Sequence, residues 1–154
     1  MSVIELGSLA PNFSLFDQNN HIVTLDSFRG KKVFIYFYPK ADTPGCTTQA
    51  CSLKEAEQDL TGVEIIGISP DLPEKLANFD DKYKLNFTLL SDPDHQVLQA
   101  YGAWGQRSLY GKKFMGVIRS ACLVDEEGKI IKLWPKISPK QTVEKLVSAL
   151  NVQS

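Results

Sequence analysis

Cysteine is scarce in this chain, with three residues among 154, and this scarcity excludes a fold that is held together by disulfides. A disulfide framework would bring more cysteines into a shorter, secreted chain. Cys46 and Cys51 lie only five positions apart, and in a reducing compartment such a close pair more often serves chemistry than architecture. Because Cys122 lies in the apolar run 121–124, we expect it to be a buried strand residue.

Histidine is rarer still, and its distribution argues against a metal centre. His21 and His95 sit in polar, turn-like surroundings, far in sequence from each other and from the cysteines. A zinc site needs closely spaced Cys or His ligands. We therefore expect no metal and no other cofactor, and a metal-binding or redox-sensing module is the weakest functional class.

The chain also lacks an excess of either charge and any long apolar run. Its 17 Lys and Arg balance 18 Asp and Glu, so electrostatics give no case for nucleic acid or an anionic membrane as a partner. No apolar stretch approaches the roughly 20 residues that cross a bilayer. Residues 1–5 lack the basic-then-apolar layout of a signal peptide. We expect a cytoplasmic protein.

Hydrophobic patterning predicts an α/β fold. Apolar residues on each side of a turn at 17–20 predict an N-terminal β-hairpin. The apolar runs 33–38 and 63–69 predict two strands, the first covered on both faces. Residues 46–60 contain no Gly or Pro and carry helix formers, and 73–83 carry apolar residues at helical spacing, so both segments predict helices. Strands that alternate with helices in this way indicate a parallel sheet with right-handed crossovers.

The second half of the chain completes this pattern. Ser138 as an N-cap, Pro139 at the first helical position and Gln141 in a capping box predict the start of a last helix, which packs on the sheet. No repeat or linker divides the chain. We therefore expect a single domain over 1–154, with a thioredoxin-like fold and an N-terminal β-hairpin extension. Weaker signals predict a strand at 87–90, a helix at 94–101, and a hairpin formed by 115–124 and 129–134.

The position of Cys46 marks it as the nucleophile. It lies at the start of the predicted helix 46–60, close to unpaired backbone N–H groups and the positive end of the helix dipole. An ordinary thiol is only about 3% ionised at pH 7, and such a position favours the reactive thiolate. The alternative is an inert cysteine at the start of a core helix.

Cys51 lies one and a half helical turns further on. In an ideal helix this spacing separates the two Cα atoms by roughly 8.6 Å, beyond the roughly 7 Å that a disulfide spans. The pair can therefore bond only after the first turns of the helix unwind. The spacing also differs from the Cys-x-x-Cys of dithiol exchangers. It suits a cycle in which Cys46 becomes a sulfenic acid and Cys51 condenses with it. The alternative for Cys51 is a packed helix cysteine.

The same segment carries a resemblance to a known family. Pro39, Thr43 and Cys46 form the pattern Pro-x-x-x-Thr-x-x-Cys, which resembles the active-site signature of peroxiredoxins. The fuller run 38–47 together with Cys51 resembles the bacterioferritin comigratory protein or peroxiredoxin Q subgroup, and the similarity extends from 10–13 to 111–119 and beyond. The resemblance implies a thioredoxin-like fold and a thiol-dependent peroxidase that reduces hydrogen peroxide or organic hydroperoxides.

The resemblance also assigns roles to residues that spacing alone does not single out. It implies that Thr43 places its hydroxyl beside the sulfur, that Arg119 stabilises the thiolate and the developing oxygen charge, and that Pro39 shields the site from water. Without the resemblance, the alternative interpretations are that Thr43 is a turn or cap residue, that Arg119 is a surface charge and that Pro39 only ends the strand.

The resemblance further implies that thioredoxin or a similar dithiol returns the electrons. A resolving thiol in the same chain removes the need for a partner subunit, so we expect a monomer. A general thiol–disulfide oxidoreductase is the alternative function, and the absence of Cys-x-x-Cys argues against it.

Overall fold

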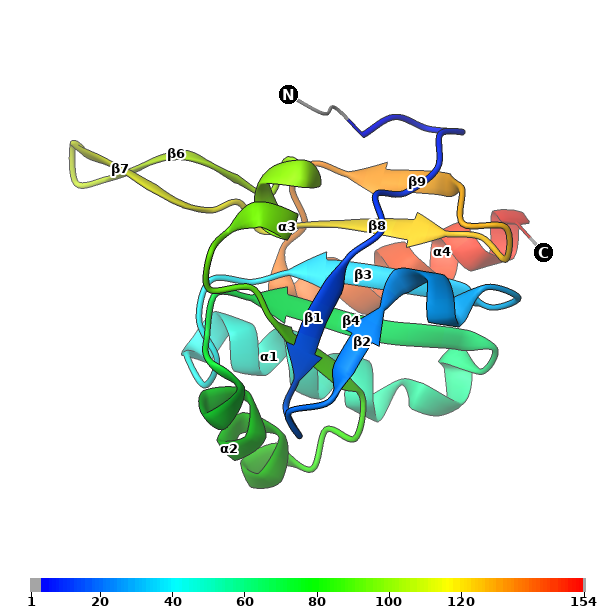
Figure 1. Ribbon diagram of the computed structural model, residues 1–154, viewed down its shortest axis with the longest axis horizontal. Coiled ribbons are helices and arrows are strands. Elements are labelled where there is room, and N and C mark those ends of the chain that lie inside the picture. Colours follow the sequence, from blue (N-terminus) through cyan, green and yellow to red (C-terminus); the bar gives the residue numbers. More distant parts are fainter. Residues whose placement is uncertain (1–3, 154) are drawn as a thin grey trace.

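The apolar run before the first cysteine forms β3 (Lys32–Phe37), the strand on which the site is built. Five of its six residues are buried, as predicted for a strand covered on both faces. It pairs in parallel with β4 (Val63–Ser69) and antiparallel with β8 (Ser120–Val124). The computed structural model describes residues 4–153, and Figure 1 shows β3 within the main sheet.

The main sheet has seven strands in the spatial order β2-β1-β5-β4-β3-β8-β9. The predicted N-terminal hairpin is present, and β1 also pairs antiparallel with β5, so the hairpin continues the main sheet rather than standing apart from it. The remaining strands of this sheet are β1 (Ser14–Asp17), β2 (Ile22–Thr24), β5 (Thr88–Ser91) and β9 (Ile130–Trp134).

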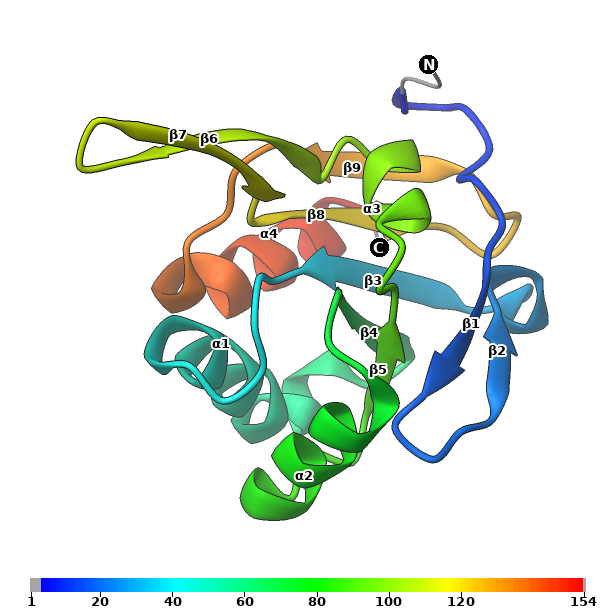
Figure 2. The same ribbon diagram turned by 60° about the vertical axis from the view of Figure 1, so that its left-hand side comes forward.

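Helices cover the two faces of the sheet unequally. Phe34 and Tyr36 point into one apolar cluster with side chains of the three longer helices, while Ile35 and Phe37 point into a second cluster on the other face. Figures 1 and 2 show α1, α2 and α4 on the first side and α3 on the other. The α-helices are α1 (Pro44–Glu55), α2 (Pro73–Tyr83), α3 (Gln96–Ala100) and α4 (Thr142–Gln153).

A second hairpin, β6 (Trp104–Leu109) with β7 (Lys112–Val117), was not predicted. It forms a separate two-stranded sheet and projects from the body of the protein (Figure 1). The strand predicted over 115–124 is split, because the chain breaks between β7 and β8 at Ile118 and Arg119, while β8 and β9 form the predicted antiparallel hairpin. Most of the β6–β7 hairpin is exposed, so its side chains do not show the alternation of buried and exposed residues that marks a strand in sequence.

Helix boundaries differ from the prediction at two places. α1 begins at Pro44, two residues before the predicted start, and its last predicted turn is the separate 3₁₀ helix η2 (Glu57–Leu60). The predicted capping box at Ser138 is wrong, because the side chain of Ser138 caps nothing. Its carbonyl instead accepts a hydrogen bond from the Thr142 hydroxyl at 2.8 Å, after the short 3₁₀ helix η3 (Pro139–Gln141).

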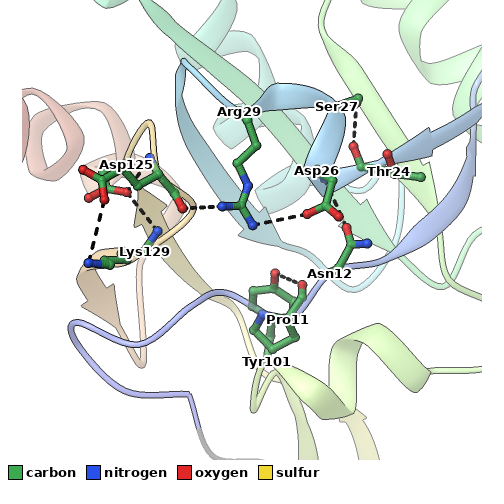
Figure 3. Close-up of polar contacts among 10 residues, drawn as sticks. Pro11, Asn12, Thr24, Asp26, Ser27, Arg29, Tyr101, Asp125 and Lys129 are labelled. Atoms are coloured by element: carbon green, nitrogen blue, oxygen red, sulfur yellow. Dashed lines mark hydrogen bonds and ion pairs between the residues drawn. The ribbon is translucent and has the colours of Figure 1, made fainter.

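Polar contacts hold the end of the sheet where β3 begins. The guanidinium of Arg29, which follows the 3₁₀ helix η1 (Leu25–Phe28), bonds to the Asp26 carboxylate at 3.3 Å and to the carbonyl of Glu127 in the β8–β9 turn (Figure 3). Because Cys46 follows the other end of β3, this turn and the cysteine lie at opposite ends of the sheet. Among the described residues, no helix is long and apolar enough to cross a membrane.

Candidate active site

The loop after β3 delivers Cys46 into the first turn of α1. Thr43 is the N-cap residue, with extended backbone, and Pro44 takes the first helical position, where its missing N–H costs nothing. Cys46 is the third residue of the helix and is only 1% exposed. Cys46 therefore belongs to the first turn of the helix, where backbone N–H groups lack helical partners, and its side chain is almost closed to water.

The loop itself is tied to α2 through Asp42, whose backbone has a left-handed φ of 60°. The Asp42 carboxylate accepts hydrogen bonds from the Tyr83 hydroxyl at 2.8 Å and the Lys82 ammonium at 3.0 Å. Both hydrogen bonds lower the pKa of the Asp42 carboxyl group, and the one from Tyr83 has the larger effect. These contacts link the loop before α1 to the end of α2.

Arg119, which lies 73 positions further along the chain, contacts Cys46. Its Nη2 donates to Cys46 Sγ at 3.3 Å, and its Nη1 donates to Gln49 Oε1 at 2.9 Å. The residue stands in the two-residue link between β7 and β8 and is half-buried, which contradicts the surface-charge alternative. A guanidinium at this distance stabilises a negative sulfur and any negative oxygen that forms beside it.

Two buried residues that sequence reasoning missed hold Arg119 in place. Gln49 and Thr142 are both 0% exposed. The Thr142 hydroxyl donates its one hydrogen to the Ser138 carbonyl at 2.8 Å, so it accepts from Gln49 Nε2 at 3.0 Å. That contact turns Gln49 Oε1 towards Arg119. The sequence held one signal that could have identified Gln49: it is a polar residue at a position of α1 that lies on the same buried face as Cys46.

Gly45 allows the guanidinium to approach the helix. A Cβ at this position would lie 3.3 Å from Arg119 Nη2 and 3.5 Å from Pro139 Cγ. The first contact is tighter than ordinary van der Waals packing, so a side chain here would displace the guanidinium. The glycine is therefore needed for space rather than for its backbone freedom.

Thr43 and Pro39 lie in the same loop, and both are half-buried. The Thr43 hydroxyl donates to the Lys40 carbonyl at 2.7 Å, a contact typical of a turn threonine. Because that bond uses its only hydrogen, the oxygen keeps its lone pairs for another donor. Pro39 follows Tyr38 directly after β3, where it ends the strand.

Cys51 lies within α1, and the thiols of both Cys46 and Cys51 are free. Its side chain is half-buried and lies outside the buried stripe that carries Cys46. Burial, together with the charge of Glu55, raises the pKa of the Cys51 thiol. The helix is continuous across both cysteines, which is the condition under which the two sulfurs cannot bond.

Cys122 takes no part in this site. It is 0% exposed in β8, as predicted, and burial raises its pKa to about 12. It packs in the cluster on the opposite face of the sheet from Cys46. In the part of the chain that the structure describes, no group of three or more His, Cys, Asp or Glu residues could hold a metal ion.

Comparisons with known proteins agree with this geometry. Residues 6–133 match the AhpC/TSA family. Peroxiredoxin Bcp of Escherichia coli K12 is 51% identical over 132 residues, which cover 84% of this chain and 85% of that protein.

Solved structures extend the similarity to nearly the whole fold. The bacterioferritin comigratory protein of Xanthomonas campestris, described with its alkyl peroxide reduction activity, matches with a TM-score of 0.88 at 29% identity and covers 99% of both chains. Peroxidoxin BcpB of Mycobacterium tuberculosis matches with a TM-score of 0.85 at 28% identity over 97% of both chains.

Proposed function

The chain belongs to the AhpC/TSA family as a thioredoxin-fold peroxiredoxin, a thiol-dependent peroxidase, and from that premise we propose that Cys46 is the thiol that attacks the peroxide. The observation that carries this proposal is the 3.3 Å contact between Arg119 Nη2 and Cys46 Sγ. Among the described residues, neither Cys51 nor Cys122 makes such a contact with a cation.

The first step transfers an electron pair from sulfur to oxygen. The Cys46 thiolate forms a bond to one peroxide oxygen as the O–O bond breaks, and the leaving oxygen takes a proton as water or alcohol. Arg119 stabilises the sulfur charge before the step and the oxygen charge during it. Thr43, whose hydrogen is held by the Lys40 carbonyl, accepts the O–H of the incoming peroxide. Pro39 limits water at the reacting atoms.

The second step forms a disulfide. The Cys51 thiolate attacks the sulfur of the Cys46 sulfenic acid, and the hydroxyl leaves as water. Because both residues are helical in the reduced form, α1 unwinds around them before the bond can close. A dithiol such as thioredoxin then reduces the disulfide by exchange through a mixed disulfide.

A general thiol–disulfide oxidoreductase remains the less favoured reading. Such enzymes carry both sulfurs in one helical turn, within reach of each other. Here the helix keeps the two apart, and Cys46 is almost fully buried, which suits a small peroxide better than a protein disulfide.

The same two-cysteine chemistry supports a proposal for the oligomeric state and the cellular location. We propose that the chain acts as a single domain and as a monomer, because both thiols of the cycle lie in one helix. A cytoplasmic setting fits a disulfide that must be reduced in every cycle.

Mass spectrometry after one equivalent of hydrogen peroxide tests the assignment. The parent chain should form a disulfide between Cys46 and Cys51, while Cys51→Ser should accumulate a sulfenic acid on Cys46. Cys46→Ser should leave the peroxide unconsumed. An intramolecular disulfide in Cys51→Ser would show that Cys122 is the resolving thiol.

A further inference from the structure

The nearly neutral chain is divided into an acidic and a basic part. Residues 1–100 carry 8 Lys and Arg against 14 Asp and Glu, a net charge of −6, whereas residues 101–154 carry 9 against 4, a net charge of +5. Three of those four carboxylates, at 125–127, follow β8 at the end of the sheet remote from Cys46. Within residues 101–154, the excess of positive charge therefore lies mainly at the end of the sheet that is nearer to Cys46.

A cavity of about 650 Å³ lies within this basic region. It is bounded by Gln106–Ser108 of β6, by the β7–β8 link, and by the chain that leads from β9 into α4; β6 and the last segment can be followed in Figure 2. Among the described residues that line the cavity, none carries a carboxylate, and the others are uncharged polar or aliphatic side chains. Its four cations are Arg107, Arg119, Lys136 and Lys145.

These cations have few partners of their own. None of them belongs to an ion pair among residues 4–153. Arg107 donates one N–H to the Val117 carbonyl, and Arg119 uses two of its five donors on Cys46 and Gln49. Like charges gathered in one hollow repel each other and attract a counterion.

The position of Arg119 joins this cavity to the catalytic thiol. The same guanidinium donates to Cys46 Sγ and lines the cavity. We propose that the cavity is an anion site, which receives the carboxylate or phosphate group of a small molecule beside the Cys46 site. This inference rests on the proposed function, because it takes Arg119 as part of the peroxidase machinery.

Two sources of the anion have different consequences. An acidic group on a hydroperoxide substrate would add binding energy, so it would lower KM for that substrate. A free anion such as inorganic phosphate would draw donors of Arg119 away from the thiolate, so it would slow the attack on any peroxide. The chemistry that recognises the group is the same in both cases.

Binding is tested with inorganic phosphate alone on the reduced, full-length chain. Backbone amide shifts of 118–120 and 136–141 are followed by NMR during the titration, at constant ionic strength maintained with sodium chloride. The double variant Arg107→Ala/Lys145→Ala should weaken saturable binding by about tenfold or more, since two charged donors are lost. The matched control, Lys112→Ala/Lys113→Ala, removes two exposed charges of the hairpin and should bind as the parent does.

Turnover then distinguishes the sources, with a short hydroperoxy acid compared with its methyl ester. If the acid has a lower KM than the ester in the parent, and the double variant loses this difference without a change in kcat, the anion is the acidic group of a hydroperoxide substrate. The other source is identified by two results together. The acid and the ester have equal KM values, and phosphate slows turnover of neutral tert-butyl hydroperoxide in the parent but not in the double variant. The site then binds a free anion.

Absence of saturable phosphate binding, or equal binding by the parent and the double variant, would overturn the anion site. Turnover of tert-butyl hydroperoxide without phosphate should be the same in the parent and both double variants. If the parent itself failed to turn it over, the proposed peroxidase function would fail, independently of the binding result.

Discussion

At the scale of single residues, the reactivity of Cys46 depends on a chain of contacts that ends far from it in sequence. The Arg119 guanidinium contacts the sulfur, Gln49 holds the guanidinium, and Thr142 at the start of α4 fixes the orientation of the Gln49 amide. Each member is buried or half-buried, so its hydrogen bonds are not exchanged for water. Thr142 is therefore a positioning residue, which acts on the sulfur through two others.

Substitution Thr142→Val tests this chain. Gln49 loses the acceptor that orients it, so Arg119 loses its anchor, and we expect kcat/KM for peroxide to fall by about tenfold. Stability should fall by roughly 1–3 kcal/mol, because a buried amide N–H is left unpaired. Thr142→Ser keeps the hydroxyl and should restore both; equal values for Val and Ser would exclude the positioning role.

Substitution Gly45→Ala separates activity from stability. Alanine favours a helix by up to about 1 kcal/mol over glycine, yet its Cβ would press on Arg119 Nη2 at 3.3 Å. We expect slower peroxide turnover with unchanged or higher resistance to denaturant. Thr48→Ala, at an exposed position of the same helix, is the control and should turn over peroxide normally. Full activity in Gly45→Ala would mean that the guanidinium has room to move aside.

At the scale of elements, α1 both builds the site and prevents the second step. The stripe Cys46, Gln49, Ala50 and Leu53 is buried, while Cys51 lies outside it. In the proposed cycle, the hydrogen bonds of the helix therefore keep Cys51 away from Cys46. The sequence predicted this constraint from the five-residue spacing alone, since helix geometry is local.

Elements that depend on long-range contacts were harder to predict. β3, β4 and α2 were predicted closely because their apolar patterns are local and strong. The β6–β7 hairpin was missed because its exposed strands carry little pattern. Gln49 and Thr142 were missed because their partners lie 70 and 93 positions away in the chain, respectively. Arg119 was found only through the family motif.

The helix also predicts how resolution depends on pH. The pKa of Cys51 is raised in folded α1 above its ordinary value of 9.0, by burial and by Glu55. Folded α1 therefore keeps the proton that the unwound segment releases, so its stability is unaffected below about pH 9 and falls as pH rises beyond it. We expect the rate of disulfide formation, measured by stopped-flow fluorescence, to increase with pH through this range.

The variant Glu55→Gln provides the control for this pH profile. Removing the like charge brings the pKa of Cys51 in folded α1 closer to its value in the unwound segment, so the increase of the rate above about pH 9 should become smaller. An unchanged profile would show that the Glu55 charge does not act on the resolving step.

At the scale of the whole molecule, the sheet separates two kinds of cysteine. Cys46 and Cys51 belong to the face covered by α1, α2 and α4, while Cys122 lies in the cluster on the other face. Because Cys122 is fully buried in β8 on that other face, we expect it to serve packing rather than redox chemistry.

Substitution Cys122→Ala should accordingly leave peroxide turnover and the Cys46–Cys51 disulfide unchanged. The small cavity it creates should lower the free energy of unfolding by about 1–2 kcal/mol, measured in urea. Loss of the disulfide in this variant, with the fold retained, would place Cys122 in the redox cycle.

Amide hydrogen exchange across residues 46–56, compared between the reduced and the peroxide-oxidised chain, tests whether Cys46 reacts at the start of an ordered helix and Cys51 reaches it only when α1 unwinds. We predict strong protection of this segment in the reduced form and its loss in the disulfide form, while β3 and β4 stay protected in both. Equal protection of 46–56 in the two forms, with the disulfide present, would show that α1 does not unwind to form the bond.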